Sequence, residues 1–268
     1  MEINRSNILD IINKADLKPD KDYGQNFLID QEISEKIVDL LGVKKEDNVL
    51  EIGPGLGSLT HFLASSKGFI TAVDIDRRMI DFLKIVYKEN NNIEIVENDI
   101  RKTKVEKFNK IVGNLPYNIT TETIQYLLLN ASKAAKMVFM IQSENFPHFF
   151  DTKGKEYGPT SILIHLLGKI EKAFVVKPGS FYPSPKCGST VFAIILNQDA
   201  DKFDSIKAFK IAKQLFLNRR KTILNNLNNY LKNKDLSINL CHDLGISPLS
   251  RPEDLSPEVY LSIARYLK

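Results

Sequence analysis

The fold is decided by the stretch Val49-Leu-Glu-Ile-Gly-Pro-Gly-Leu-Gly57. A short apolar run ends there at Gly53, and Gly55 and Gly57 follow at a spacing of two before a segment of helical length. Glycine lets the backbone turn tightly and approach a ligand closely, so the stretch predicts a strand, a glycine loop and the start of a helix. The spacing is not the GxGxxG pattern of dinucleotide-binding proteins.

Similar apolar runs follow along the chain, and each leads into a polar residue. The runs are residues 69–73, 93–97 and 110–113, and the polar residues after them are Asp74, Asp99 and Asn114. Segments of helical length separate the runs, and this alternation predicts a parallel sheet with helices on both faces. Because ligands of such sheets bind at the carboxyl ends of the strands, we expect an α/β fold whose site gathers these residues with Gly53.

The rest of the chain predicts further elements on either side of this sheet. We expect helices at 31–41, 77–87, 203–231 and 257–267, and strands at 137–141, 173–176 and 190–196. A polar linker covers residues 197–202. We therefore predict two domains, a ligand-binding domain over residues 1–197 and a small helical domain over residues 203–268.

The composition, with 43% hydrophobic and 26% charged residues, is that of a globular protein. No segment approaches the ~20 apolar residues that cross a bilayer, and the N-terminus has no apolar run of signal-peptide length, so we expect a cytoplasmic protein. The two cysteines and four histidines lack the spacing of metal ligands, so we expect no metal. Residues 201–268 carry 12 Lys and Arg against 7 Asp and Glu, which suits a polyanionic partner.

The polar residues at the strand ends carry the groups that a nucleoside cofactor needs. Asp74 can accept hydrogen bonds from both hydroxyls of a ribose, and Asp99 can accept one from an adenine amino group. Asn114 offers a donor and an acceptor near the reactive end of the cofactor. With the glycine spacing, this set favours S-adenosylmethionine over a nicotinamide cofactor. A nicotinamide-dependent oxidoreductase is the alternative.

The segment Asn114-Leu-Pro-Tyr117 has the chemistry for methylating an adenine amine. The lone pair of that amine is delocalised into the ring, so it must be freed and aimed at the methyl group. The side-chain oxygen of Asn114 and the carbonyl of Leu115 can accept hydrogen bonds from its two N–H groups, while Pro116 stiffens the turn. Tyr117 can stack on a base flipped out of its helix. Transfer from a positively charged sulfur then depends mainly on positioning.

Several segments together resemble the ribosomal RNA adenine N6-dimethyltransferases. They are Gly24-Gln-Asn-Phe-Leu-Ile-Asp30, Leu50-Glu-Ile-Gly-Pro-Gly-Leu-Gly57, Asn114-Leu-Pro-Tyr-Asn-Ile119 and Phe181-Tyr-Pro-Ser-Pro-Lys186. Their order and spacing match across nearly the whole chain. The segments Asn218-Arg-Arg-Lys-Thr-Ile-Leu-Asn-Asn-Leu227 and Arg251-Pro-Glu-Asp-Leu-Ser256 resemble the KsgA type of this family rather than the macrolide-resistance Erm type. The resemblance implies a Rossmann-like S-adenosylmethionine-dependent methyltransferase domain and a small C-terminal α-helical domain.

The resemblance also implies roles for single residues. S-adenosylmethionine, whose product is S-adenosylhomocysteine, would contact Asn26, Leu28, Gly53, Gly55, Asp74, Asp99 and Asn114. The methyl-transfer site would consist of Asn114, Leu115, Pro116, Tyr117 and Phe181, with the two aromatic rings on either side of the target base. The chain departs from relatives at Asp74, where they usually have Glu, and within the segments 142–145 and 185–189. These departures leave the methyl-transfer residues intact.

The implied substrate is a pair of adjacent adenosines in a hairpin loop near the 3′ end of small-subunit (16S) rRNA. Each would be dimethylated within an assembling 30S particle by a monomeric enzyme. Arg219, Arg220 and Lys221 are candidates for phosphate contacts, with a solvated helix face as the alternative. Two further functions stay open, an Erm-type dimethyltransferase of 23S rRNA and a mainly non-catalytic assembly factor that binds immature particles.

Overall fold

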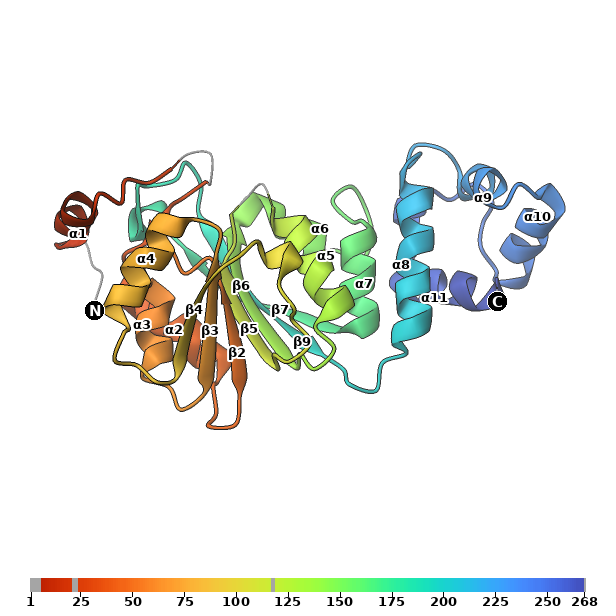
Figure 1. Cartoon of the computed structure of the whole chain (residues 1–268). Helices are drawn as coiled ribbons and strands as arrows, with labels where there is room; N and C mark the ends of the chain where they lie inside the picture. The colour runs from red at the N-terminus through yellow and green to blue at the C-terminus, as the bar shows by residue number, and fades with distance from the viewer. Residues whose placement is uncertain (1–5, 21–23, 117–118, 268) are drawn as a thin grey trace. The chain divides into compact units, whose positions relative to one another are not determined.

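The computed structural model describes residues 6–20, 24–116 and 119–267 (Figure 1). The chain forms two compact units. The sheet unit comprises Met1–Ser143 and Glu171–Ile195, and the helical unit comprises Glu144–Ile170 and Leu196–Lys268.

A seven-stranded sheet runs in the order β4-β3-β2-β5-β6-β9-β7 (Figure 1). Its strands are β2 (Asn48–Ile52), β3 (Phe69–Asp74), β4 (Ile93–Glu97), β5 (Lys110–Asn114), β6 (Lys136–Gln142), β7 (Gly168–Val176) and β9 (Ser189–Leu196). The pairs from β4 to β6 are parallel, and β9 pairs antiparallel with β6. Chain order reverses between β2 and β5, and this reversal marks where open α/β sheets bind ligands. The predicted α/β architecture is confirmed.

Helices and short strands complete the sheet unit. They are α1 (Ile8–Ala15), α2 (Gln31–Leu41), α3 (Ser58–Ala64), α4 (Arg77–Val86), α5 (Thr120–Asn130), η1 (Ile100–Lys102), η2 (Ser143–Asn145), η3 (Pro178–Ser180), β1 (Phe27–Leu28) and β8 (Phe181–Tyr182), of which η2 begins at the unit boundary. The helices α2 and α3 pack against each other, and their apolar side chains meet one face of the sheet. The core there contains Ile37, Leu41, Leu59, Leu63, Val49, Val112 and Val138, and each such side chain contributes about 1.5–3 kcal/mol by burial.

Two lysines of the sheet close the C-terminal end of α2. The ammonium group of Lys110 donates hydrogen bonds to the carbonyls of Leu41, at 2.8 Å, and Gly42, and that of Lys136 donates to Leu40. Helix ends leave such carbonyls without helical partners, and positive charge is favourable beside them. These lysines therefore hold α2 in place across the strands that carry the predicted site.

The helical unit consists of α6 (Pro147–Phe150), α7 (Pro159–Leu167), α8 (Lys202–Phe216), α9 (Ile223–Leu231), α10 (Lys234–Asp243), η4 (Pro252–Asp254) and α11 (Pro257–Tyr266). The helix predicted over 203–231 is thus two helices with a turn between them. The side-chain amide of Asn226 donates to the carbonyls of Asn218, Lys221 and Thr222, each at 3.1 Å, and so stabilises the turn. The sequence did not predict this turn, because the residues on both sides of it have helical periodicity.

The units differ from the predicted domain boundary in one segment. Residues 144–170 lie in the helical unit, whereas the sequence placed them with the sheet. The reason is their packing, because Tyr157 and Ile162 are buried in the same core as Ile211, Leu215 and Tyr260. No described helix is long and apolar enough to cross a membrane.

A carboxyl group is buried in the middle of the sheet. Glu51 on β2 is 1% exposed, and the hydroxyl of Thr60 on α3 donates to its Oε2 at 2.8 Å. Burial raises the pKa of Glu51 to about 8, and the negative charge of Asp74 adds to this shift. The group is therefore mainly protonated in the folded protein at neutral pH, but ionised in the unfolded chain.

This difference in protonation makes stability depend on pH. Between the ordinary pKa of 4.5 and the folded value of about 8, only the folded state retains the proton of Glu51, so its contribution to stability is lost as pH rises. Glu51→Gln should remove that loss, which is on the order of 3 kcal/mol. Urea unfolding of both proteins at pH 5, 6, 7 and 8 measures the difference. Glu35→Gln removes an exposed carboxylate as the control, and a difference between wild type and Glu51→Gln that does not vary with pH would contradict the expectation.

Candidate active site

The carboxyl ends of the parallel strands open into a cavity of about 340 Å³ within the sheet unit. This size is in the range of small-molecule sites. Among its lining residues are Asn26, Leu28, Gly53, Gly55, Asp74, Asp99, Asn114, Leu115, Pro116 and Phe181. The structure thus brings together the site residues predicted in this unit, except that Tyr117 lies outside the described residues.

The glycine loop after β2 forms one wall of the cavity. Gly55 has a φ of 54°, and a Cβ atom there would come within 3.2 Å of the ring of Phe27. At Gly57, where φ is 94°, a Cβ atom would lie 2.9 Å from Leu83. The positive φ disfavours a side chain at both positions, and Gly55, which lines the cavity, presents its backbone to it.

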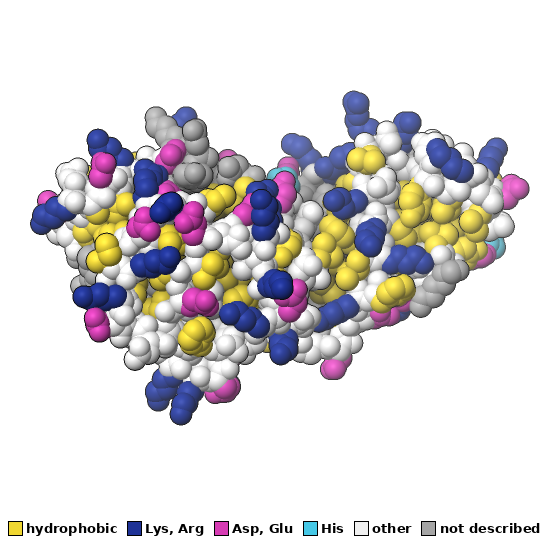
Figure 2. Space-filling view, viewed as in Figure 1, with side chains coloured by type: hydrophobic (Ala, Val, Ile, Leu, Met, Phe, Trp, Pro, Cys, Tyr) yellow, Lys and Arg dark blue, Asp and Glu magenta, His cyan; other side chains and the backbone are white. Residues whose placement is uncertain are grey.

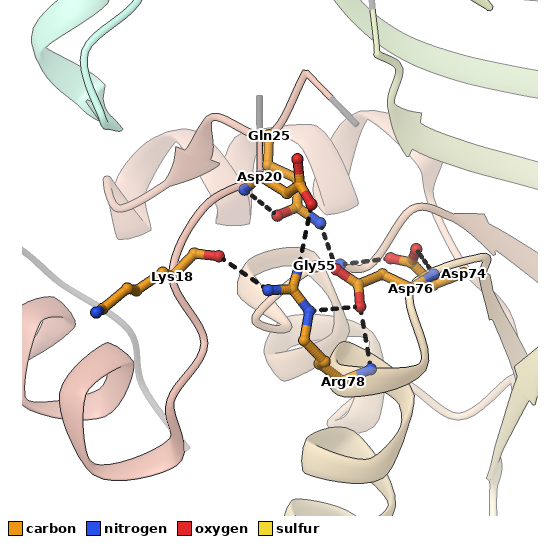
Figure 3. Close-up of polar contacts among 7 residues, drawn as sticks. All are labelled: Lys18, Asp20, Gln25, Gly55, Asp74, Asp76 and Arg78. Atoms are coloured by element: carbon orange, nitrogen blue, oxygen red, sulfur yellow. Dashed lines mark hydrogen bonds and ion pairs between the residues drawn. The ribbon is translucent and has the colours of Figure 1, made fainter. Parts of the chain in front are cut away.

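Asp74 ends β3 beside this loop. Its Oδ2 accepts a hydrogen bond from the Gly55 N–H at 3.3 Å, and its Oδ1 accepts one from the Asp76 N–H at 3.0 Å (Figure 3). Burial raises the pKa of Asp74 above its ordinary value, although both hydrogen bonds lower it. The carboxylate is held in a fixed orientation, and each oxygen keeps a second lone pair for a ligand.

Asp99 follows β4 and has a cationic partner that the sequence analysis did not identify. Arg101 donates to its two carboxylate oxygens from Nε at 3.1 Å and from a terminal nitrogen at 2.7 Å. These hydrogen bonds hold the pKa of Asp99 below its ordinary value. Both residues line the cavity, so this wall is a paired charge rather than a free carboxylate. The sequence did hold one signal for this pair, because an arginine two residues after an aspartate can reach its carboxylate.

Asn114 ends β5, and its amide has a defined orientation. Its Nδ2 donates a hydrogen bond to the backbone carbonyl of Asn26 at 3.3 Å. This leaves Oδ1 as the acceptor for a ligand. The following turn is fixed by the Leu115 N–H, which donates to Met140, and by the Thr120 hydroxyl, which donates to the Pro116 carbonyl at 2.8 Å.

A small two-stranded sheet joins two motifs that lie far apart in the sequence. Strands β1 and β8 are antiparallel, with Leu28 opposite Phe181. The hydroxyl of Ser180 also donates to Asp30 at 2.9 Å. Phe181 is 4% exposed and contributes to the cavity wall, so β1 carries the N-terminal segment and β8 the aromatic ring to the same place.

The departures within the segments 142–145 and 185–189 contact one another. The Ser143 N–H donates to the carbonyl of Gly188 at 2.9 Å, and the Thr190 hydroxyl donates to the Ser143 hydroxyl at 2.9 Å. A Cβ atom at Gly188 would lie 3.0 Å from the carbonyl of Val176. The departures from relatives in these two segments therefore lie at one place in the structure.

The three basic residues at the turn between α8 and α9, Arg219, Arg220 and Lys221, differ in their surroundings. Arg219 donates to Glu253 at 2.5 Å and to the carbonyl of Gly154 at 3.2 Å, with its guanidinium over the ring of Phe216. Its contacts are thus structural. Arg220 and Lys221 are exposed, and Figure 2 shows more basic than acidic side chains on the visible face of the helical unit. Among the described residues, no group of His, Cys, Asp and Glu is placed to hold a metal.

Known proteins that resemble this chain over most of its length are methyltransferases. Ribosomal RNA small subunit methyltransferase A of Malacoplasma penetrans is 34% identical over 260 residues, which cover 95% of this chain and 94% of that protein. The crystal structure of a dimethyladenosine transferase from Plasmodium falciparum matches with a TM-score of 0.75 and 26% identity, over 88% of this chain and 95% of that one. The 23S rRNA methyltransferase ErmE shares the fold, with a TM-score of 0.70 and 22% identity over 90% and 99% of the two chains.

The family model "Ribosomal RNA adenine dimethylase" matches residues 16–268, which include both units apart from the first residues. A methyltransferase family leaves no place for the nicotinamide-dependent oxidoreductase that was the alternative. With the match of the model and the identity to relatives over nearly their full length, this chain belongs to the ribosomal RNA adenine dimethylase family.

Proposed function

We propose that this protein uses S-adenosylmethionine to dimethylate the N6 amine of two adjacent adenosines in a hairpin loop near the 3′ end of small-subunit rRNA. The observation that carries the proposal is the oriented amide of Asn114, which lies at the end of β5 in the cavity that also contains Asp74 and Asp99. The similarity to small-subunit methyltransferases supports this substrate over 23S rRNA. The intact methyl-transfer segment argues against a purely non-catalytic assembly factor.

The residues of the cavity fit S-adenosylmethionine. Asp74 accepts hydrogen bonds from the ribose hydroxyls, and Asp99 accepts one from the adenine amino group. Gly53 and Gly55, whose φ values of 64° and 54° disfavour a side chain, would lie beside the methionine part, and Asn26 and Leu28 would cover it from the N-terminal segment. When bound, the cofactor supplies a methyl group already activated by its positively charged sulfur. Asp74 is shorter than the usual Glu, and its hydrogen bonds to the glycine loop keep it at the cavity wall.

The other residues position the target amine. Oδ1 of Asn114 and the carbonyl of Leu115 accept hydrogen bonds from its two N–H groups, which directs the nitrogen lone pair toward the methyl group. Phe181 stacks on the flipped base, with Tyr117 on its other face. Each transfer would leave one excess proton on the nitrogen, which passes to water, and S-adenosylhomocysteine would be the leaving group. Hairpin-loop bases suit such a site because they are more easily extruded than paired ones.

The partner in this proposal is rRNA within an assembling 30S particle, met by a monomeric enzyme in the cytoplasm. Arg220 and Lys221 contact RNA phosphates, because they are exposed on the turn between α8 and α9. Arg219 instead supports that turn through Glu253 and Gly154. A helical domain that binds RNA is consistent with the basic excess of residues 201–268.

Asn114→Ala tests the mechanism. Removing one preorganised acceptor should lower turnover by about 100-fold to 1,000-fold. Affinity for S-adenosylmethionine should stay within about tenfold, because the lost interaction belongs to the transition state. Transfer of labelled methyl groups to unmethylated small-subunit particles measures turnover, and calorimetry measures cofactor binding. Asn91→Ala, at an exposed turn, is the control. Near-normal turnover in Asn114→Ala would refute the mechanism.

The roles of the basic residues can be separated by substitution. Arg220→Ala with Lys221→Ala should weaken binding to small-subunit particles and reduce the slope of log affinity against log salt by about 2. Arg219→Ala should mainly lower the melting temperature, because it removes the ion pair with Glu253. Lys44→Ala with Lys45→Ala removes the same charge from the sheet unit as the control. An unchanged salt slope in the Arg220 and Lys221 variant would exclude phosphate contacts by these residues.

A further inference from the structure

An ion pair between a buried aspartate and a more exposed arginine lies immediately outside the cavity, at the start of α4. Asp76 is 3% exposed, and both of its carboxylate oxygens accept hydrogen bonds from the guanidinium of Arg78, at 3.0 and 2.6 Å (Figure 3). Its Oδ1 also caps α4 by accepting from the Arg78 N–H at 3.0 Å. Although burial raises the pKa of Asp76, the hydrogen bonds from Arg78 and Gln25 hold it below its ordinary value. The acceptor is therefore a carboxylate.

This ion pair anchors the N-terminal segment to the sheet. The side chain of Gln25 donates from Nε2 to Asp76 Oδ2 at 2.9 Å, and its Oε1 accepts from the Asp20 N–H at 2.9 Å (Figure 3). Arg78 donates to the backbone carbonyl of Lys18 at 3.3 Å. The anchor joins residues that are more than 50 positions apart in the sequence, and it places the backbone around Gln25 beside the cavity.

The anchored backbone leads directly to the catalytic amide. Asn26 follows Gln25, and its carbonyl is the group that accepts the hydrogen bond from Asn114 Nδ2. The two ends of an amide have nearly the same shape, so only hydrogen bonds decide which end faces a ligand. If the Asn26 carbonyl moved away, Asn114 could turn its NH2 group toward the substrate amine, where two donors would oppose each other.

We propose that Asp76, acting through Gln25, is a positioning residue that keeps the Asn26 carbonyl against Asn114 and so keeps Asn114 Oδ1 directed at the substrate. This inference rests on the proposed function, because it assumes that Oδ1 accepts from the target amine. Asp76 is not among the residues that line the cavity, so its side chain acts without touching cofactor or base. Its backbone N–H, which holds Asp74, is unaffected by changes to the side chain.

Asp76→Asn tests this role with little change in shape. The new amide keeps an oxygen to cap α4 but places an NH2 group opposite the NH2 group of Gln25. We expect the single-turnover methylation rate to fall about tenfold, with S-adenosylmethionine affinity within about threefold by calorimetry. Combining Asp76→Asn with Gln25→Glu restores a donor facing an acceptor and should recover most of the rate. Asp81→Asn, at an exposed position on α4, is the control. An unchanged rate in Asp76→Asn would overturn the inference.

The combination with Asn114→Ala separates positioning from general destabilisation. If Asp76 acts by orienting Asn114, Asp76→Asn should cause no further loss in the Asn114→Ala background, whereas an equal further loss would overturn the inference. Gln25→Met provides a second variant if Asp76→Asn does not fold, and the same absence of further loss is expected for it. If Asn114→Ala alone keeps normal turnover, the proposed mechanism fails instead, so the two failures are distinguishable.

Discussion

The hydrogen bond from Asn114 Nδ2 to the Asn26 carbonyl is the interaction on which the rest of the site depends. It ties the N-terminal segment to the carboxyl end of β5 and decides which end of the amide is presented to a ligand. Two parts of the surrounding structure hold its donor and its acceptor. The sheet fixes Asn114 through parallel pairing with β2 and β6, and the network around Asp76 fixes the backbone next to Asn26.

The three acidic side chains at the cavity are in different charge states or have different partners. Asp99 is paired with Arg101, Asp74 is held by backbone N–H groups, and Glu51 is buried and mainly protonated near neutral pH. The negative charge of the cavity is therefore concentrated at Asp74, which suits the positively charged sulfur of the proposed cofactor.

The sequence was sufficient to predict the seven strands of the large sheet, the glycine loop and the places of Asp74, Asp99 and Asn114 at or just after strand ends, because parallel strands place their ends at one edge regardless of detail. It did not predict the short strands β1 and β8. It missed the pairing of Asp99 with Arg101, although the two residues are only two positions apart. It also missed the contact of Gln25 with Asp76, because a side-chain contact between distant residues leaves no periodic signal. The turn before α9 was missed because Asn226, which stabilises it, reads as an ordinary helical residue. Residues 144–170 were placed with the wrong unit because their packing partners lie in α8 and α11.

In the proposed function, this chain methylates adjacent adenosines of small-subunit rRNA through Asn114. Mass spectrometry of small-subunit and large-subunit rRNA from cells that lack the gene, and from cells complemented with wild type or Asn114→Ala, tests it most directly. We expect two adjacent N6,N6-dimethyladenosines in small-subunit rRNA that disappear without the gene and return only with the wild type. Dimethyladenosine that persists in small-subunit rRNA of the deletion cells, or that is lost from large-subunit rRNA instead, would contradict it.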